Sequence, residues 1–353
     1  MKGSVLKKFL CTCLVTAAAF AATTISASAC TTIYVGGDLV EEGTPFVART
    51  EDYGSDYNKL WFISESGKWK QGDHYVGCPA YGPFEWDFTH DSYRFTYFTN
   101  DIYYDGTCPE CGKKADHYSY TEFGTNEKGV SVSATETLYG NEKVTEADPY
   151  RDAEWAEANK SERIGIEETD IPTIILAEAS SAREGVKLLL DIYENYGCVY
   201  ASGVFICDKD EVWYIENCSG TQYVAIKLND NMIFLEPNMA VIGRVDLDDE
   251  NVIASKDLIA VAKKAGTFVG DEAKNIIDFR ASYARISEKM DQRMIDGLNY
   301  LNATYKYDSD ALVADNTKFT ISNLDASDKL VALYTNIKAD RKLDKDDVFG
   351  YYK

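Results

Sequence analysis

A cysteine directly follows a segment with the three zones of a secretory signal peptide, so cleavage there would make it the first residue of the folded chain. The first 29 residues begin with lysines, continue with the apolar stretch from Phe9 to Ala22 and end in the small residues Ser26–Ala29. This order of charge, apolar residues and A-x-A site is typical of export signals. We therefore predict that residues 1–29 are a signal peptide cleaved after Ala29, and that the mature chain begins at Cys30.

An amino-terminal cysteine carries a thiol and a free α-amine on one residue. The unperturbed pKa of an α-amine is about 7.7–8.0, so near neutrality a useful fraction can accept the proton of the thiol. Cys30 is therefore a candidate nucleophile that supplies its own general base. Two other interpretations are a disulfide half, or the acylated cysteine of a lipid-anchored binding protein. A lipoprotein signal favours a large aliphatic residue three positions before the cysteine, and this chain has Ala27 there.

The composition favours a packed extracellular domain and argues against two classes of partner. Hydrophobic residues make up 45% of the chain and aromatic residues 13%, which supports a globular core. The net charge of −22 becomes −25 when Lys2, Lys7 and Lys8 leave with the signal. A chain this acidic repels nucleic acid and anionic membrane surfaces, so we predict neither as a partner. We expect a secreted bacterial protein with one domain, residues 30–353, and leave a homo-oligomer open.

Cysteines and histidines give weak evidence for a metal. The mature chain keeps an odd number of cysteines, which suggests at least one free thiol. Cys108-Pro-Glu-Cys111, followed by His117, would need Cys78 or His74 to complete a zinc site. A single C-x-x-C without a second pair is insufficient, and a local disulfide or two inert thiols is favoured. We predict no metal and no cofactor.

Hydrophobic periodicity predicts strands first and helices later. Strands are expected at Cys30–Val35, Phe46–Arg49 and Gly129–Thr135, and the polar stretch Glu146–Asp170 is expected to be a solvated surface excursion. A capping box, Ser181-Ala-Arg-Glu184, predicts a helix that Gly197 ends.

The segments after Gly197 complete the expected element order. They comprise an antiparallel meander and then helices: strands Val199–Ile206, Val212–Glu216, Gln222–Leu228 and Met232–Leu235, helix Val252–Ala265, and further helical sequence to about Leu301. Strands, helix, strands and then helices indicate a layered α+β domain.

Several ordered segments resemble the dipeptidase A family of N-terminal-nucleophile cysteine peptidases. The resemblance covers nearly the whole mature chain and includes the segments 30–36, 47–52, 125–130, 133–137, 164–168, 181–186, 212–216, 237–238, 279–284 and 342–348. It implies a four-layer αββα sandwich of two antiparallel sheets flanked by helices, with Cys30 at the start of a central strand. It also implies hydrolysis of dipeptides that bear a free amino terminus.

The same resemblance implies the remaining site residues. Arg49 and Asp52 match the family's charged pair on the return strand; Arg49 would favour the thiolate, and Asp52 would accept a hydrogen bond from the α-amine. Asn238 matches an asparagine whose side-chain amide polarises the substrate carbonyl. Arg293 matches a further arginine only loosely, and we interpret it as a solvated helix charge.

Three points keep alternatives open. Relatives usually have Gly-His-Gln-Trp where this chain has Gly220-Thr-Gln-Tyr223, so the preferred substrate is open. Bile-salt and penicillin amidases are similar in the catalytic opening and offer an alternative activity. Relatives also continue past the point where this chain stops, so its C-terminal part is expected to be shortened.

The acidic stretches Asp246–Glu250 and Asp340–Asp347 lack the ligand spacing and glycine of a calcium loop and are interpreted as solvated.

Overall fold

The computed structural model describes residues 29–52, 59–77, 84–100, 121–136, 138–285, 292–301, 330–332 and 341–352. The predicted signal segment up to Ser28, and Cys78, Cys108, Cys111 and His117, lie outside these residues. In the described part of the chain, no helix combines the length and apolar character needed to cross a bilayer.

The predicted amino-terminal hairpin is confirmed. β1 (Ala29–Val35) pairs antiparallel with β2 (Phe46–Asp52), and the 3-10 turn η1 (Gly37–Leu39) lies in the connection between them. The other neighbour of β1 is β12 (Ile233–Glu236), which gives a three-stranded sheet in the order β12-β1-β2. The meander prediction is wrong for this last strand, because Ile233–Glu236 leaves its sequence neighbours to pair with β1. Cys30 thus begins the central strand of this sheet.

A larger, eight-stranded antiparallel sheet lies beside it, in the order β14-β11-β10-β9-β8-β7-β6-β3. Its strands are β3 (Lys59–Ser64), β6 (Phe95–Asn100), β7 (Phe123–Asn126), β8 (Ser131–Glu136), β9 (Ser202–Cys207), β10 (Val212–Asn217), β11 (Tyr223–Lys227) and β14 (Val252–Ala254). Smaller sheets comprise β15 (Gly270–Asp271), β16 (Ile276–Asp278), β13 (Ile242–Asp246) and β17 (Leu330–Ala332), and the hairpin of β4 (His74–Val76) and β5 (Glu85–Asp87).

Successive side chains of the central strands point to opposite faces of the large sheet, so the apolar core has two parts, one on each face. One face of the large sheet, with Val204, Ile206, Trp213 and Ile215, packs against α4 (Ile171–Glu178) and α5 (Ala182–Asn195). The opposite face, with Phe205 and Tyr214 among its residues, packs against Phe234 of the three-stranded sheet. This period of two is what a strand buried on both faces requires.

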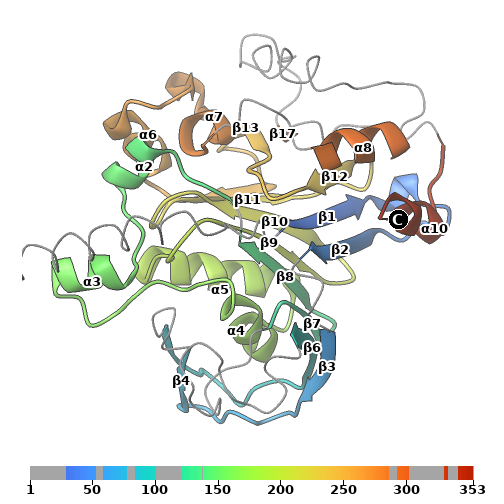
Figure 1. Cartoon of the computed structure of the whole chain (residues 1–353), viewed down its shortest axis with the longest axis horizontal. Helices are drawn as coiled ribbons and strands as arrows, with labels where there is room; N and C mark the ends of the chain where they lie inside the picture. Colours follow the sequence, from blue (N-terminus) through green and yellow to red (C-terminus); the bar gives the residue numbers. More distant parts are fainter. Residues whose placement is uncertain are drawn as a thin grey trace, which may run out of the picture.

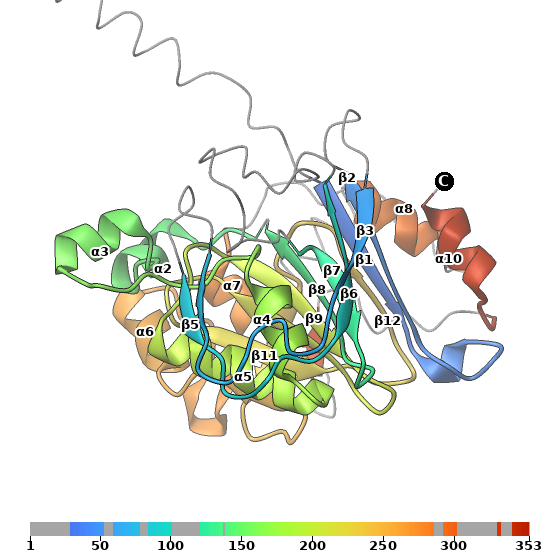
Figure 2. The ribbon, with the colours of Figure 1, turned by 90° about the horizontal axis from the view of Figure 1, so that it is seen from below.

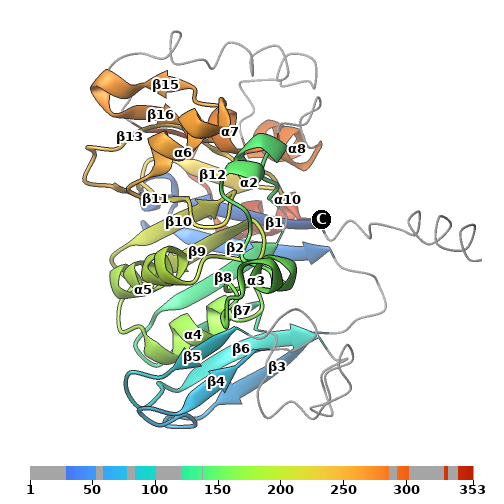
Figure 3. The same cartoon turned by 90° about the vertical axis from the view of Figure 1, so that its left-hand side faces the viewer.

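Further helices pack beside the three-stranded and four-stranded sheets. They are α6 (Leu258–Ala265), α7 (Phe279–Tyr283), α8 (Gln292–Leu301) and α10 (Lys345–Tyr351), while α2 (Glu142–Ala147), α3 (Ala153–Asn159) and the 3-10 turn η3 (Glu272–Lys274) lie at the periphery. Figure 1 shows α4 and α5 on one side of the large sheet and α6, α7 and α8 on the other side, near the three-stranded and four-stranded sheets, and Figures 2 and 3 show the same order from other sides. The α+β prediction is confirmed.

Two local predictions are wrong. The stretch Glu146–Asp170 is not a solvated excursion throughout, because its second half, Ile164–Asp170, is buried and supplies three buried carboxyl groups. The helix expected over Val252–Ala265 begins only at Leu258, and its first residues form β14. The capping box is half present: Ser181 Oγ accepts from Glu184 N–H, but the Glu184 carboxylate turns to Ser180.

Candidate active site

Strand register places five polar side chains on one face of the three-stranded sheet. Thr32 lies opposite Glu236 of β12 and Arg49 of β2, and Cys30 lies opposite Glu51. Opposed residues in an antiparallel pair point to the same side, and so do residues two apart on one strand. This face is turned toward the large sheet, because Arg49 Nη1 reaches the Ala134 carbonyl of β8 at 2.5 Å.

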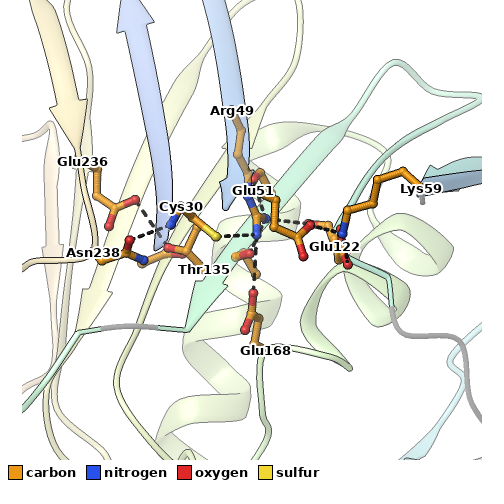
Figure 4. A network of polar contacts seen from close by, with 12 residues as sticks. Cys30, Arg49, Glu51, Lys59, Glu122, Thr135, Glu168, Glu236 and Asn238 are labelled. Atoms are coloured by element: carbon orange, nitrogen blue, oxygen red, sulfur yellow. Dashed lines mark hydrogen bonds and ion pairs between the residues drawn. The ribbon is translucent and has the colours of Figure 1, made fainter. Parts of the chain in front are cut away.

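Cys30 is held on three sides and is only 3% exposed. Arg49 Nη2 lies 3.3 Å from its Sγ, and its backbone nitrogen donates to Asn238 Oδ1 at 2.5 Å. Its carbonyl oxygen accepts from Arg293 Nη1 at 2.6 Å. Figure 4 shows the sulfur directed at the Arg49 guanidinium and the nitrogen at Asn238. The site therefore fixes both the thiol and the nitrogen of one residue.

Arg49 is a buried and heavily bonded cation. Its Nη1 donates to the Glu122 carbonyl at 3.1 Å and to Ser133 Oγ at 3.2 Å, and its Nη2 lies 3.7 Å from Glu168 Oε1. Burial disfavours the guanidinium charge, but Cys30 and Glu168 outweigh it and raise the pKa of Arg49 above its usual value. The cation is thus a permanent charge beside the sulfur.

Burial is also the largest influence on the thiol itself. It raises the pKa of Cys30 to about 11; Arg49 acts in the opposite direction, and Glu168 raises the pKa further. Arg49 favours the thiolate, as predicted, but not strongly enough to overcome desolvation. The thiol therefore needs a proton acceptor at the moment it attacks.

A second group of charges adjoins Arg49. Lys59 Nζ lies 2.6 Å from both carboxyl oxygens of Glu122 and also pairs with Glu51. Burial, followed by the hydrogen bond with Glu51, raises the pKa of Glu122 to about 9. The pKa of Glu51 is lowered in spite of its burial, because Glu122 and Lys59 donate to it. Glu122 is therefore the carboxyl group of the pair that keeps a proton.

Asn238 occupies a turn conformation and also contacts Cys30. Its φ of 47° is left-handed, a region that Asn tolerates better than most residues. Its Oδ1 accepts from Arg293 Nη1 at 2.9 Å as well as from Cys30 N. Arg293 also donates to Thr31 Oγ1 and to the Pro237 carbonyl. Interpreting Arg293 as a solvated helix charge is wrong, because this side chain ties β1 to the turn that carries Asn238.

The structure thus brings Cys30, Arg49 and Asn238 together. Asp52 ends β2 with its backbone opposite Ala29, and its side chain lies outside the described residues, so its predicted contact with the α-amine stays a prediction. Sequence reasoning missed Glu168 and Glu236. Glu168 falls in a matched segment, and Glu236 directly precedes Pro237-Asn238, so position next to a recognised motif was the only available signal.

Metal and disulfide chemistry find little support in the described residues. Among them, no group of three or more His, Cys, Asp or Glu side chains is placed to hold a metal. Cys30, Cys198, Cys207 and Cys218 are free thiols. The residues of the weak zinc candidate lie outside the described part, except His74, which pairs with Asp87 at 2.7 Å.

Comparisons with known proteins agree with the resemblance in the sequence. Residues 29–311 match the family model described as peptidase family C69. The chain is 33% identical over 304 residues to a protein named "Probable dipeptidase B" from Streptococcus pyogenes serotype M3, which covers 84% of this chain and 55% of the relative. It is 32% identical over 262 residues to a "Probable dipeptidase" from Salmonella dublin, covering 73% and 53%. The chain therefore spans about half the length of the curated relatives it matches.

Two solved structures show a distant likeness. Penicillin V acylase from Agrobacterium tumefaciens is similar with a TM-score of 0.32 and 14% identity over 59% of this chain and 49% of that one. A mutant of the conjugated bile acid hydrolase from Clostridium perfringens is similar with a TM-score of 0.29 and 13% identity over 69% and 59%. We draw no argument from likenesses at this level.

Proposed function

The chain belongs to peptidase family C69, and from this premise we propose that its mature form is a secreted cysteine dipeptidase with Cys30 as an amino-terminal nucleophile. The observation that carries the proposal is the setting of Cys30. One residue has its sulfur on a fixed guanidinium and its nitrogen on the Asn238 side chain, 2.5 Å away. The layering of helices, two sheets and helices suits the N-terminal-nucleophile sandwich that the sequence resemblance implies.

The first half of the proposed reaction forms a thioester. After signal cleavage the Cys30 nitrogen is a free amine, which accepts the proton of the thiol while the sulfur attacks the peptide carbonyl carbon. Arg49 stabilises the negative sulfur before the new bond forms. The side-chain amide of Asn238, oriented through Oδ1, donates through Nδ2 to the oxyanion. The α-ammonium then returns the proton to the leaving nitrogen as the C–N bond breaks.

The second half hydrolyses the thioester. The α-amine takes a proton from a water molecule, whose oxygen attacks the thioester carbon, and the C–S bond breaks to release the acid and restore the thiol. One group thus acts as base and then as acid in each half. Because the α-amine carries out these proton transfers, the proposed mechanism needs no histidine beside the sulfur.

The charges near the sulfur suit a substrate with a free amino terminus. Glu51, Glu122 and Glu168 face the two cations Arg49 and Lys59. A substrate ammonium beside this cluster would let Glu122 lose the proton that it otherwise keeps. The curated relatives carry dipeptidase names, which supports the same substrate class.

A substrate panel tests the assignment. The mature chain beginning at Cys30 is given free dipeptides, the same dipeptides with an acetylated amino terminus, glycine-conjugated bile acids and phenoxymethylpenicillin. We expect turnover of the free dipeptides, and none by Cys30→Ala, which controls for contaminating peptidases. Faster turnover of the acetylated or conjugated compounds would replace the dipeptidase assignment with an amidase. A lipid adduct on Cys30 of the exported protein, seen by intact mass, would indicate the lipid-anchored alternative instead.

A further inference from the structure

Three buried polar atoms form a row across the three-stranded sheet, two residues along β1 from Cys30 and on the same face of the sheet. They are Oε1 of Glu236, Oγ1 of Thr32 and Nε of Arg49, and none has a hydrogen-bond partner among the residues that the structure describes. Their residues are direct cross-strand neighbours on β12, β1 and β2. Glu236 and Thr32 are fully buried, and the Arg49 side chain is 9% exposed.

These atoms have complementary hydrogen-bonding capacity. The Arg49 N–H is a donor, the Glu236 oxygen an acceptor, and the Thr32 hydroxyl can be either. Leaving a buried polar group unpaired costs about 1–3 kcal/mol, so three in one row call for a common partner. A buried water molecule typically bonds about three polar groups of this kind. One water that accepts from Arg49, donates to Glu236 and bonds Thr32 satisfies the whole row.

The hydrogen bonds around Glu236 indicate that its carboxyl group is protonated. Thr135 Oγ1 lies 3.1 Å from the Gly203 carbonyl and 3.4 Å from Glu236 Oε2. A hydroxyl has a single hydrogen, and the nearer carbonyl can only accept it. Thr135 therefore donates mainly to this carbonyl and only at long range to Glu236 Oε2. A fully buried carboxyl group with so few donors around it favours the neutral acid over the carboxylate.

The neighbouring buried carboxyl group supports this assignment, because its surroundings are the opposite. Glu216 accepts from the backbone N–H of Val241 at 2.6 Å, from Ile242 N–H and from the Tyr214 hydroxyl at 3.0 Å. Donors therefore surround Glu216 and favour its charge. Burial, with Glu216 as the next cause, raises the pKa of Glu236 to about 8. Burial raises the pKa of Glu216 as well, to about 7. The difference between the two carboxyl groups lies in their donors, which surround Glu216 and are nearly absent around Glu236.

We propose that Glu236 is a positioning residue of the thiol site, held in its neutral form, which shares one internal water molecule with Thr32 and Arg49 and so fixes the guanidinium against the Cys30 sulfur. The inference rests on the proposed function for its effect on turnover. The charged or titratable groups that face Glu236 are Arg49 on β2, Arg293 on α8, Glu216 and Tyr214 on β10, and Cys30 on β1. An ionised Glu236 would add a second negative charge beside Arg49 and oppose formation of the thiolate.

The decisive variant is Glu236→Gln, which keeps the shape and one donor but cannot ionise. The readout is the rate at which iodoacetamide alkylates Cys30 in the mature protein, measured from about pH 6.5 to about pH 9.5, on either side of the pKa of about 8. We expect the ratio of the variant's rate to that of the wild type to rise by about threefold or more across this range. We expect Glu236→Ala to be slower than both at every pH, because Arg49 and Thr32 lose the third partner of their water.

Two results overturn the proposal. If the ratio for Glu236→Gln stays flat with pH, ionisation of Glu236 is not linked to the thiol. If Glu236→Gln is as slow as Glu236→Ala throughout, the site needs a carboxylate and not a neutral group. Because alkylation needs no dipeptide, a rising ratio together with a failed dipeptide panel would leave this inference standing and remove only the proposed substrate class.

Thr32 offers a matched pair of variants. Thr32→Val removes the hydroxyl from the row, and Thr99→Val removes another buried hydroxyl, on β6, that also has no partner among the described residues. We expect the first to slow alkylation by about threefold or more and the second to leave it unchanged. Equal effects would contradict the proposal. A high-resolution crystal structure of the mature protein should show water density between the three atoms, and a dry site there would also contradict it.

Discussion

The Cys30 sulfur lies in a setting that opposes its own ionisation. Burial dominates the pKa of the thiol, and Arg49, the cation that contacts the sulfur, also forms an ion pair with Glu168. A thiol of this kind attacks only when its proton has a nearby acceptor, and the acceptor we propose is the α-amine that cleavage after Ala29 would create on the same residue. The amino-terminal position that we propose for Cys30 is therefore as important as its side chain.

Asn238 tests how the oxyanion is stabilised. Asn238→Ala should lower kcat by about 10²–10³, with little change in KM, because removal of one oxyanion donor typically costs this much. Steady-state kinetics on a dipeptide measure it, and Cys30 should stay alkylatable. Asn238→Asp should be at least as damaging, because it puts a carboxylate where an oxyanion forms.

The left-handed backbone at this position requires a control. Asn238→Gly removes the amide but accepts the φ of 47° without strain, so it should be as inactive as the alanine variant. Asn275→Ala, at a φ of 54° in an exposed loop, carries the same backbone cost and should keep full activity. Retention of more than about a tenth of wild-type kcat by Asn238→Ala falls short of the expected loss and would reduce Asn238 to a turn residue.

Glu236 should also make the stability of the protein depend on pH. Its pKa is raised from 4.5 to about 8 in the folded state, so the folded protein binds more protons between these values. The contribution of this group is fully present below about pH 4.5 and is lost as pH rises through about 8. In urea unfolding, the free energy of unfolding of Glu236→Gln should therefore rise relative to that of the wild type between about pH 5 and about pH 8. Parallel stability curves would contradict the assignment of a neutral Glu236.

Among the elements, those set by local pattern could be predicted and those set by distant partners could not. Alternating apolar residues and a turn predicted β1 and β2, and the Ser181 cap predicted α5. The sequence of β12 resembles that of the meander strands before it. Nothing in this local sequence indicates that β12 pairs with β1, about 200 residues earlier. Ile164–Asp170 looks solvated because it is acidic, yet Glu168 meets Arg49 and Asp170 accepts from the Tyr75 hydroxyl at 2.6 Å. Polar composition cannot reveal such partners.

Asn126, which lies in one of the recognised motifs, is a structural residue between two elements. Its Nδ2 donates to the carbonyls of Leu176 and Ala179 at the end of α4, and its Oδ1 accepts from the N–H of Lys128 and Val130. Asn126→Ala removes the side-chain partner of four backbone groups, three of them in buried hydrogen bonds, and should lower the free energy of unfolding by about 2–4 kcal/mol.

Urea unfolding measures this loss, and a surface variant calibrates it. Asn159→Ala removes one exposed helix contact, from Nδ2 to the Trp155 carbonyl, and should change stability by less than about 0.5 kcal/mol. Remaining folded Asn126→Ala should keep the wild-type kcat per molecule, because the residue lies outside the thiol site. Equal effects of the two substitutions on stability would show that the four hydrogen bonds of Asn126 contribute nothing.

At the scale of the whole molecule, the layers bury Cys30 and the rest of β1. The three-stranded sheet lies between the large sheet and α8 with α10, and Tyr352, next to α10, donates its hydroxyl to the Thr31 and Ala48 carbonyls. Arg293 on α8 reaches the carbonyl of Cys30 from the same side. The export-signal pattern indicated Cys30, and the family resemblance supplied Arg49 and Asn238. The contact of Arg293 depends on how α8 packs, which the sequence does not reveal.

Net charge gives a prediction that belongs to the whole chain. With a net charge of −22, self-repulsion should destabilise the compact state at low ionic strength. The melting temperature should therefore rise as NaCl increases from about 0.05 M to about 0.5 M, where the Debye length becomes short. KCl should give the same rise, since screening is indifferent to the cation. A fall, or a rise confined to one salt, would point to a specific ion instead.

The central claim is that the free α-amine of Cys30 is the proton carrier, and one extra residue tests it most directly. A mature chain with a single Ala placed before Cys30 keeps the thiol, Arg49 and Asn238 but converts the nitrogen into a non-basic amide. The account predicts that this protein, with its mass confirming the extra residue, folds as the parent does and is alkylated at Cys30, yet does not hydrolyse dipeptides. Turnover near the rate of the unextended protein would contradict the account.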